Sequence, residues 1–327
     1  MKQTRNNETD KKIYDYIIIG AGPAGCFCAM QLKAKRKSVL ILEKNGIGYG
    51  KVCGDGISMK CVDLLKRLNF PIERFEKLGA ALIHKRIIIK NGTRQVTHFG
   101  LDDGTMSFGI SRVKTDYIFR TYATELGVDI IYNTNVTKIN KSKSFFSIHN
   151  FYAKRVIVAC GAFSNLNILG TKICCSTKNM AVGISTTITC KCNAEPCFLF
   201  DYDNRYKGQY AWIFKTDNDN WNVGLWLRQD KNMLKTYFND FINNKLPQYL
   251  GDDCQIKYSP KGAIMAIKRD SIVGNPIYKP RINGIYYIGD IDLTSNELDG
   301  EGIRQAIISG ILLACKLTRT RMKKILL

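Results

Sequence analysis

The segment IYDYIIIGAGPAG, residues 13–25, decides the fold expected for this chain. Its first seven residues are mostly Ile and Tyr and predict a buried strand, which runs directly into a glycine turn. A helical pattern then extends from Cys26 to about Arg36, and SVLILE, residues 38–43, predicts a second buried strand. A strand, glycine turn, helix and strand in this order are typical of a dinucleotide-binding unit.

The glycines of this turn have separate expected roles. Gly20 allows the tight turn, Gly22 lets the backbone approach a pyrophosphate, and Gly25 permits close packing of the helix on the strand. Free amides and the helix dipole favour a negatively charged group at the start of the helix. Glu43 ends the second strand, where it is placed to accept hydrogen bonds from ribose hydroxyls. The simpler alternative is a glycine-rich turn without a ligand.

The rest of the chain divides by pattern. A helix is expected at 111–128, buried strands at 155–160 and 284–290, and a last helix at 301–318, whereas 171–268 alternates like strands around one helix. The predicted fold class is α/β, with a Rossmann-type cofactor domain interleaved with a β-rich substrate domain. The expected cofactor-domain segments are 1–80, 111–170 and 269–327, and the substrate-domain segments are 81–110 and 171–268.

Charge suggests partners but no specific one. The chain has 49 basic and 28 acidic residues, a formal net charge of +21. The basic residues are spread along the chain, so simple abundance of Lys explains most of the excess. An acidic electron carrier, a phosphorylated cofactor or an anionic membrane surface would also fit this charge. Nucleic acid is not an expected partner, because there is no basic stripe or recognised nucleic-acid motif.

The expected location is cytoplasmic, with at most peripheral contact to a membrane. The segment MKQTRNNETDKK, residues 1–12, is polar and unlike a secretion signal, and the longest apolar run is interrupted by Gly and Pro. A reducing compartment predicts free thiols for the twelve cysteines. No metal site is expected, because Cys190, Cys192 and Cys197 lack paired C-x-x-C spacing and only three histidines are present.

Four segments carry a resemblance to known flavoproteins. GAGPAG with Glu43, RVKTDYIFRTYATELGV at 112–128, RVIVACGAFSNL at 155–166 and NGIYYIGD at 283–290 resemble the flavin-binding segments of the para-hydroxybenzoate hydroxylase-like fold in order and spacing. The resemblance implies FAD as cofactor. It also implies that Arg112 reaches toward FAD and that Asp290 binds the ribityl chain through its carboxylate.

Further motifs resemble the geranylgeranyl reductase family. These are KVCGDGIS at 51–58, GQYAWIFK at 208–215, NVGLW at 222–226 and GDIDLTSNELDGEGI at 289–303. The chain is interpreted as a divergent member, which implies an FAD-dependent oxidoreductase that reduces C=C bonds of an apolar, prenyl-type lipid. The cofactor contacts implied by all these segments are Gly20, Gly22, Ala24, Gly25, Glu43, Lys51, Gly54, Arg112, Gly289, Asp290, Gly300, Gly302 and Ile303.

An apolar wall is expected beside the flavin. Tyr210, Trp212 and Phe214 alternate along a strand and therefore project to one face, suited to a polyprenyl chain or a quinone. The alternative is an ordinary aromatic face packed in the core. Amides around Gly300 and Gly302, at the start of the last helix, would stabilise negative charge on reduced flavin, or only cap the helix.

Cys53 is the candidate catalytic residue, although the flavin carries the hydride. The resemblance implies a place near the isoalloxazine ring and the substrate, where the thiol could contact the alkene or supply a proton. An equally good alternative is a small structural residue in a glycine turn. Lys51 is expected to contribute the positive field that lowers a thiol pKa.

Departures from the family patterns bear on the electron donor. ACGAFSNLN has Cys160 and Asn167 where the hydroxylases have Asp and Arg, so a hydroxylase and direct reduction by NADPH are both disfavoured. A ferredoxin-like carrier is the other expected donor. A halogenase is disfavoured because a W-x-W-x-I-P stretch is missing, and an electron-transfer dehydrogenase serving quinone or ferredoxin remains an alternative.

Overall fold

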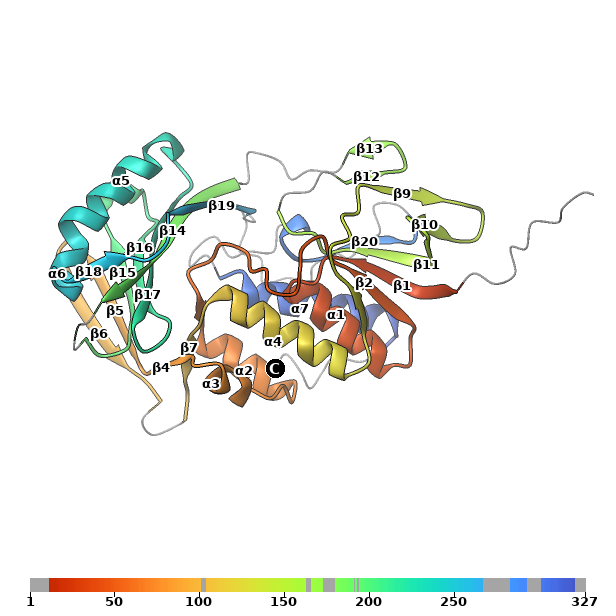
Figure 1. Ribbon diagram of the computed structural model, residues 1–327, viewed down its shortest axis with the longest axis horizontal. Helices are drawn as coiled ribbons and strands as arrows, with labels where there is room; N and C mark the ends of the chain where they lie inside the picture. Colours follow the sequence, from red (N-terminus) through yellow and green to blue (C-terminus); the bar gives the residue numbers. More distant parts are fainter. Residues whose placement is uncertain are drawn as a thin grey trace, which may run out of the picture.

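The computed structural model describes residues 12–100, 104–162, 166–172, 180–190, 192, 194–266, 283–292 and 301–320. Within this part of the chain, two large sheets lie toward opposite ends of the long axis, with a three-stranded sheet and helices between them (Figure 1). The α/β class with a Rossmann-type sheet and a second, β-rich sheet is confirmed. The predicted segment boundaries of the two domains stay a prediction.

The first sheet contains the dinucleotide-binding unit. Its parallel strands, in spatial order, are β20 (Ile285–Tyr287), β11 (Phe151–Val158), β1 (Ile13–Ile19), β2 (Val39–Leu42) and β8 (Asp129–Ile131). β2 reads VLIL and is buried along its whole length, as expected for a parallel strand covered on both faces. On one side β11 continues into β10 (Phe146–Ile148), β9 (Lys138–Lys141), β12 (Asn167–Ile168) and β13 (Thr171–Lys172).

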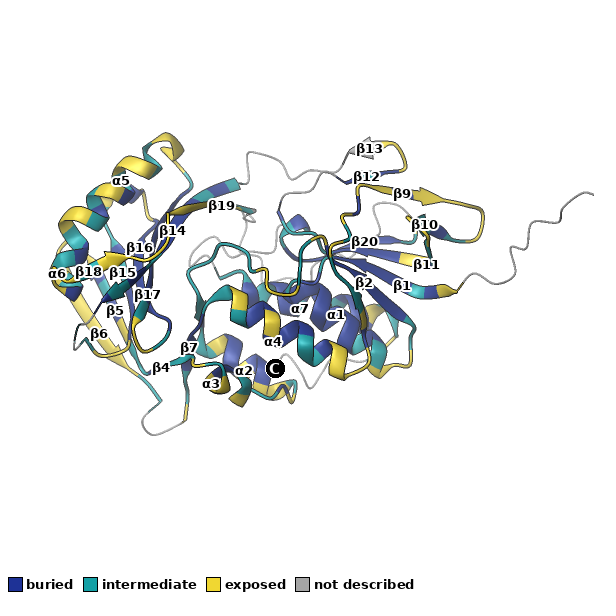
Figure 2. Cartoon of the chain, viewed as in Figure 1, coloured by how far each residue is buried: buried dark blue, intermediate teal, exposed yellow. Residues whose placement is uncertain are grey.

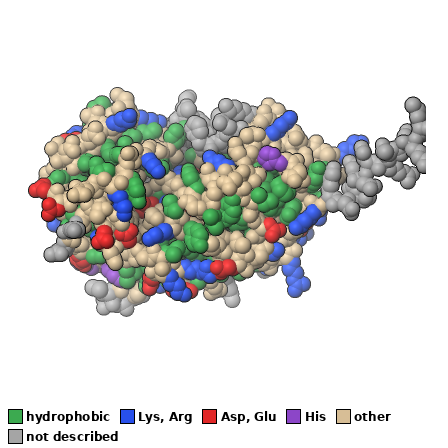
Figure 3. Space-filling view, viewed as in Figure 1, with side chains coloured by type: hydrophobic (Ala, Val, Ile, Leu, Met, Phe, Trp, Pro, Cys, Tyr) green, Lys and Arg blue, Asp and Glu red, His purple; other side chains and the backbone are tan. Residues whose placement is uncertain are grey.

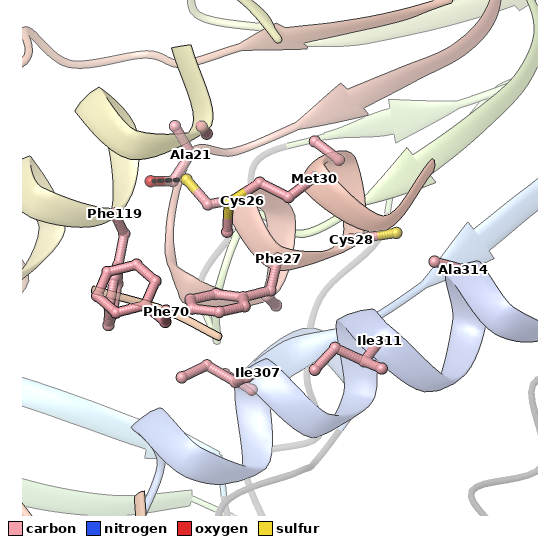
Figure 4. Packing of buried hydrophobic residues seen from close by; sticks show 14 of the residues in the cluster. Ala21, Cys26, Phe27, Cys28, Met30, Phe70, Phe119, Ile307, Ile311 and Ala314 are labelled. Carbon is pink, nitrogen blue, oxygen red and sulfur yellow. Dashed lines mark hydrogen bonds between the residues drawn. The ribbon is translucent and has the colours of Figure 1, made fainter. Parts of the chain in front are cut away.

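Three long helices cover one face of this sheet: α1 (Pro23–Ala34), α4 (Arg112–Glu125) and α7 (Ile303–Leu317) (Figure 1). α1 begins three residues before the predicted Cys26, because Gly22 caps it and Pro23 suits the first helical position. Figure 4 shows Phe27 of α1 against Phe119 of α4, with ring centroids 5.1 Å apart. The smaller helices α2 (Met59–Arg67) and α3 (Glu73–Lys77) pack next to this core.

The second sheet has the order β18-β14-β17-β16-β15-β5-β6, with β19 also paired to β14. Its strands are β5 (Lys85–Lys90), β6 (Thr93–His98), β14 (Met180–Cys190), β15 (Phe198–Tyr202), β16 (Ala211–Lys215), β17 (Asn220–Leu227), β18 (Cys254–Ile256) and β19 (Lys261–Ala266). One face packs on α5 (Leu234–Asp240), a π-turn η4 (Phe241–Lys245) and α6 (Leu246–Leu250), whose outer sides are exposed (Figure 2). The other face carries aromatic side chains.

Short elements connect the two sheets. β3 (Gly56–Ile57), β7 (Ser107–Gly109) and β4 (Ala81–Ile83) form the small sheet, and 3-10 turns occur at η2 (Asn204–Tyr206), η3 (Lys231–Met233) and η5 (Gly289–Asp292). A Cβ at Gly109 would lie 1.6 Å from the carbonyl oxygen of Lys215, so the small sheet approaches β16 as closely as backbones allow. The residues between the sheets are therefore fixed from both sides.

The surface gives two further observations. Lys and Arg side chains are scattered over the visible face and do not gather in one patch (Figure 3). Among the helices that the structure describes, none combines the length and the hydropathy needed to cross a bilayer.

Candidate active site

The glycine turn joins β1 to α1 at the carboxyl edge of the parallel strands. Gly20 has φ +107°, and a Cβ there would lie 2.5 Å from the carbonyl oxygen of Ala159, so only glycine fits. A Cβ at Gly25 would lie 2.0 Å from the carbonyl oxygen of Gly20. At Gly22, in contrast, a Cβ would meet no atom within 4 Å. The turn is closed toward the protein and open at Gly22, which leaves the space that a pyrophosphate requires.

Glu43 follows β2 at the same edge and is 6% exposed. Its Oε2 accepts a hydrogen bond from the backbone N–H of Ala21 at 2.7 Å, and its Oε1 accepts from the backbone and side-chain N–H groups of Asn45 at 3.0 and 3.1 Å. Near Glu43, the buried hydroxyl of Tyr132 has no hydrogen-bond partner among the described atoms. A buried carboxylate and an unpartnered hydroxyl beside the glycine turn suit the hydroxyls of a ribose.

Arg120 is a site residue that the sequence reasoning missed. Its guanidinium is 2% exposed and donates from Nε to the carbonyl oxygen of Ala21 at 3.0 Å. Nη1 donates to the carbonyl oxygens of Ile47 at 2.9 Å and Tyr49 at 2.7 Å. One buried side chain therefore ties the glycine turn to the loop that follows β2. The available signal was a charged stripe on α4, since Asp116 and Arg120 are four residues apart and on one helix face.

The loop of residues 51–58 crosses from the first sheet toward the second. Asp55 has φ +63°, and its Oδ1 accepts from the backbone N–H of Arg112 at 2.8 Å. Its Oδ2 accepts from Nδ2 of Asn222 in β17 at 2.7 Å. Burial raises the pKa of the Asp55 carboxyl to about 7, although these donors favour its charged form. Asp55 and Asn222 are further residues that the sequence reasoning did not identify, because they are 167 positions apart.

Cys53 lies in this loop with its thiol beside the Arg112 guanidinium. Burial raises the pKa of the Cys53 thiol, and the nearby guanidinium only partly offsets that rise. The cation beside the thiol is thus Arg112 and not the expected Lys51, whose Nζ instead contacts Oδ2 of Asp290 at 2.6 Å. Arg112 is itself held by Asp116, with Nε 2.7 Å from Oδ1. A raised pKa keeps the proton on the Cys53 sulfur at neutral pH.

Tyr210, Trp212 and Phe214 project from the β16 segment to one face and form the aromatic wall, each 7–8% exposed. That low exposure also suits an ordinary core face. What connects the wall to the site is Gly54, where a Cβ would lie 3.3 Å from Nε1 of Trp212 and 3.3 Å from the Phe214 ring. The loop with Cys53 therefore rests directly on the aromatic wall.

The C-terminal segment completes the edge of the first sheet. Gly289 has φ +72°, its N–H donates to Oγ of Ser309 at 3.0 Å, and a Cβ there would lie 3.1 Å from the Cβ of Ala24. Ala24 thus packs between α1 and this turn. Gly302 precedes α7, which begins at Ile303. The predicted Gly300 lies outside the described residues, whereas the adjacent Glu301 accepts a hydrogen bond from the Ser58 hydroxyl.

Comparison with protein families and with known proteins identifies sequences that are similar to this chain. A family model described as "Pyridine nucleotide-disulphide oxidoreductase" matches residues 14–179. A protein of Methanosarcina mazei named digeranylgeranylglycerophospholipid reductase is 25% identical over 320 residues, which are 92% of this chain and 74% of that protein. The resemblance predicted from the motifs is confirmed by this name and coverage.

Solved structures show the same fold. A geranylgeranyl bacteriochlorophyll reductase-like protein of Thermoplasma acidophilum aligns with a TM-score of 0.78 and 19% identity, covering 94% of this chain and 78% of that one. A flavin-dependent brominase aligns with a TM-score of 0.73 and 18% identity, covering 94% and 80%. At these identities the likeness establishes the flavoprotein fold and leaves the reaction to be argued from the site.

Proposed function

The chain belongs to the pyridine nucleotide-disulphide oxidoreductase family. We propose that it is an FAD-dependent enzyme that reduces C=C bonds of a prenyl-type lipid, which the name of its Methanosarcina mazei relative supports. The observation that carries the proposal is the contact between the loop of Cys53 and the aromatic wall. It brings a protonated thiol and an apolar surface together, and both sit beside the edge where the nucleotide unit ends. An isolated alkene offers no polar group for recognition, so an apolar surface suits its binding, and its saturation needs a proton, which a protonated thiol can supply.

The residues present fit FAD. Gly20, Gly22 and Gly25 would receive the pyrophosphate at the start of α1, and Glu43 would accept from the ribose hydroxyls. Asp290 is proposed to bind the ribityl chain, in competition with the ion pair that it makes with Lys51. We also propose that Gly289, Gly302 and Ile303, and Gly300 from outside the described residues, border the flavin ring, as their motif implies. When bound and reduced, the flavin would supply a hydride to one alkene carbon.

Saturation of a C=C bond also needs a proton on the second carbon. Cys53 is proposed to hold it, because the raised pKa of its thiol leaves the S–H bond intact at neutral pH. As the new C–H bond forms, the S–H bond breaks, and the resulting thiolate takes a proton from solvent. Arg112 stabilises that thiolate while it lasts, since its guanidinium lies beside the sulfur.

The apolar chain of the substrate is proposed to lie on the aromatic wall. Phe198 and Phe214, with ring centroids 4.6 Å apart, extend the wall onto β15. A prenyl chain would bind there by burial of its methyl groups, at roughly 25 cal/mol per Å² of apolar surface removed from water. The electron donor is proposed to be an acidic carrier protein, because the chain has a net charge of +21.

The test combines a spectrum with a product assay. Purified protein loaded with FAD and reduced with dithionite under anaerobic conditions should convert a geranylgeranyl lipid to products heavier by two hydrogens for each bond reduced. Cys53→Ala should lower this turnover by at least about tenfold with an unchanged flavin spectrum. Cys192→Ala removes a half-buried thiol near the second sheet and is the matched control; it should leave the turnover unchanged. A protein that binds no flavin, or that turns over equally well with Cys53→Ala, contradicts this assignment.

A further inference from the structure

We propose that Asn222 is a positioning residue that holds the Cys53 loop and the indole of Trp212 in one fixed arrangement. The inference rests on the proposed function only in taking that arrangement to be the substrate site. Asn222 lies on β17 of the second sheet, 4% exposed, at the point where the loop of residues 51–58 reaches the aromatic wall. It is therefore the link between the two halves of the candidate active site.

The side-chain amide of Asn222 both donates and accepts hydrogen bonds. Nδ2 donates to Oδ2 of Asp55 at 2.7 Å and to the carbonyl oxygen of Cys53 at 3.0 Å, so both of its N–H groups are engaged. Oδ1 accepts from Nε1 of Trp212 at 2.7 Å. An indole nitrogen can only donate, and a carbonyl oxygen can only accept. The amide therefore has a single satisfactory orientation, and that orientation fixes both neighbours at once.

Two glycines make room for the indole ring of Trp212. Gly224 shares a face of β17 with Asn222, and a Cβ there would lie 2.2 Å from Cζ2 of Trp212 and 2.6 Å from the carbonyl oxygen of Ile184. Across the ring, a Cβ at Gly54 would lie 3.3 Å from Nε1. The indole is thus held closely between the loop and the strand. The N-V-G spacing has a physical reason: the glycine makes room for the ring, and the amide two residues earlier receives its N–H.

The arrangement makes the place of the Cys53 thiol depend on the second sheet. Asp55 sits at φ +63°, a conformation that costs a non-glycine residue energy and persists only when its neighbours hold it. The bonds from Asn222 and from the Arg112 backbone provide that restraint. Among the described residues, no hydrogen bond joins the Asn222 side chain to the glycine turn, Glu43 or Arg120. Its loss should therefore loosen the thiol relative to the wall and leave FAD binding unchanged.

The first test measures the rate at which N-ethylmaleimide alkylates Cys53 in the FAD-loaded protein. Mass spectrometry of the loop peptide monitors the modified fraction over time. Asn222→Asp keeps an acceptor for Trp212 but places an oxygen against the Asp55 carboxylate and the Cys53 carbonyl. We expect alkylation roughly tenfold faster than wild type at about pH 8, as loss of a charge-assisted hydrogen bond implies. At about pH 6 a proton shared between the two carboxyls should restore the bond and lower that ratio.

Two comparisons make the result specific. Asn204→Asp, the same chemical change at an exposed position of η2, should leave the Cys53 alkylation rate at the wild-type value. Trp212→Phe keeps an aromatic ring but removes the N–H that orients the amide, so a smaller increase in rate is expected, and this variant serves if Asn222→Asp does not fold. The FAD dissociation constant, from flavin fluorescence, should stay within about twofold of wild type in every variant.

The outcomes separate the inference from the proposed function. An unchanged Cys53 alkylation rate in Asn222→Asp, or in Trp212→Phe if that alone folds, overturns the positioning role and leaves Asn222 as a partner for a buried indole. A faster rate in a protein that reduces no prenyl lipid keeps the positioning role and refutes the proposed substrate. If both the rate rises and lipid turnover falls with KM unchanged, Asn222 positions the proton-bearing thiol for the reaction.

Discussion

Arg120→Met tests whether the buried Arg120 guanidinium anchors the glycine turn and the loop after β2, where FAD is proposed to bind. The substitution keeps the unbranched stem of the side chain but removes the guanidinium, which donates to the carbonyl oxygens of Ala21, Ile47 and Tyr49 at 3.0, 2.9 and 2.7 Å. It also removes a weaker ion pair to Asp116, whose Oδ2 is 3.9 Å from Nη2. The glycine turn and the loop after β2 would lose their common anchor.

The expected cost follows from these contacts. Each lost hydrogen bond contributes about 1 kcal/mol, and the carbonyl of Ala21 keeps only the weak donor Sγ of Cys26, at 3.4 Å, in a place that water reaches poorly. Asp116 keeps its 2.7 Å contact with Arg112, so its charge stays paired. The free energy of unfolding should therefore fall by about 3–4 kcal/mol, a large share of the 5–15 kcal/mol that is typical of a native protein. FAD affinity should fall by at least about tenfold, because Ala21 belongs to the turn that receives it.

Urea unfolding of the FAD-free protein measures the first effect, and flavin fluorescence titration measures the second. At a urea slope of about 2–3 kcal/mol per M, the midpoint should move down by at least about 1 M. Arg67→Met is the matched control, because Arg67 is 43% exposed in an ion pair with Asp63 and should change stability by less than about 0.5 kcal/mol. A loss below about 1 kcal/mol for Arg120→Met would refute the anchoring argument.

Three other changes have defined expectations. Glu43→Gln leaves one oxygen for the donors of Ala21 and Asn45, so FAD should bind roughly tenfold more weakly in a fluorescence titration, and equal affinity would deny Glu43 its role. For Asp55, a folded pKa of about 7 lies above the unfolded value of about 3.9, so the folded state holds the extra proton and stability falls as pH rises from about 4 to 7. Asn also adopts the positive φ of this position, so in Asp55→Asn the urea midpoint should lack this dependence on pH. An identical pH dependence in the variant would mean that another group causes it. Gly310→Ala would place a Cβ 2.3 Å from the carbonyl oxygen of Ala24 and should lower the melting temperature by several degrees, because α1 and α7 must separate.

Local sequence determined the nucleotide unit. The apolar run ending at Ile19, the glycine turn and SVLILE each specify their own element through side-chain period and glycine geometry, and these elements form as expected. The position of Glu43 followed because parallel strands end at one edge. The common face of Tyr210 and Trp212 followed from strand alternation in the same way.

Tertiary structure alone decided which side chains meet. Lys51 is 239 residues from Asp290, and Asn222 is 169 residues from Cys53, so no spacing in the sequence relates either pair. Periodicity tells which face a residue occupies but not which distant loop will lie against that face. For the same reason the sequence indicated Lys51 as a source of positive field for the Cys53 thiol without showing its distance, whereas the folded chain puts Arg112 beside the sulfur. The pKa values of Cys53 and Asp55 depend on burial and on partners from other segments, and these exist only once the two sheets have packed around the loop.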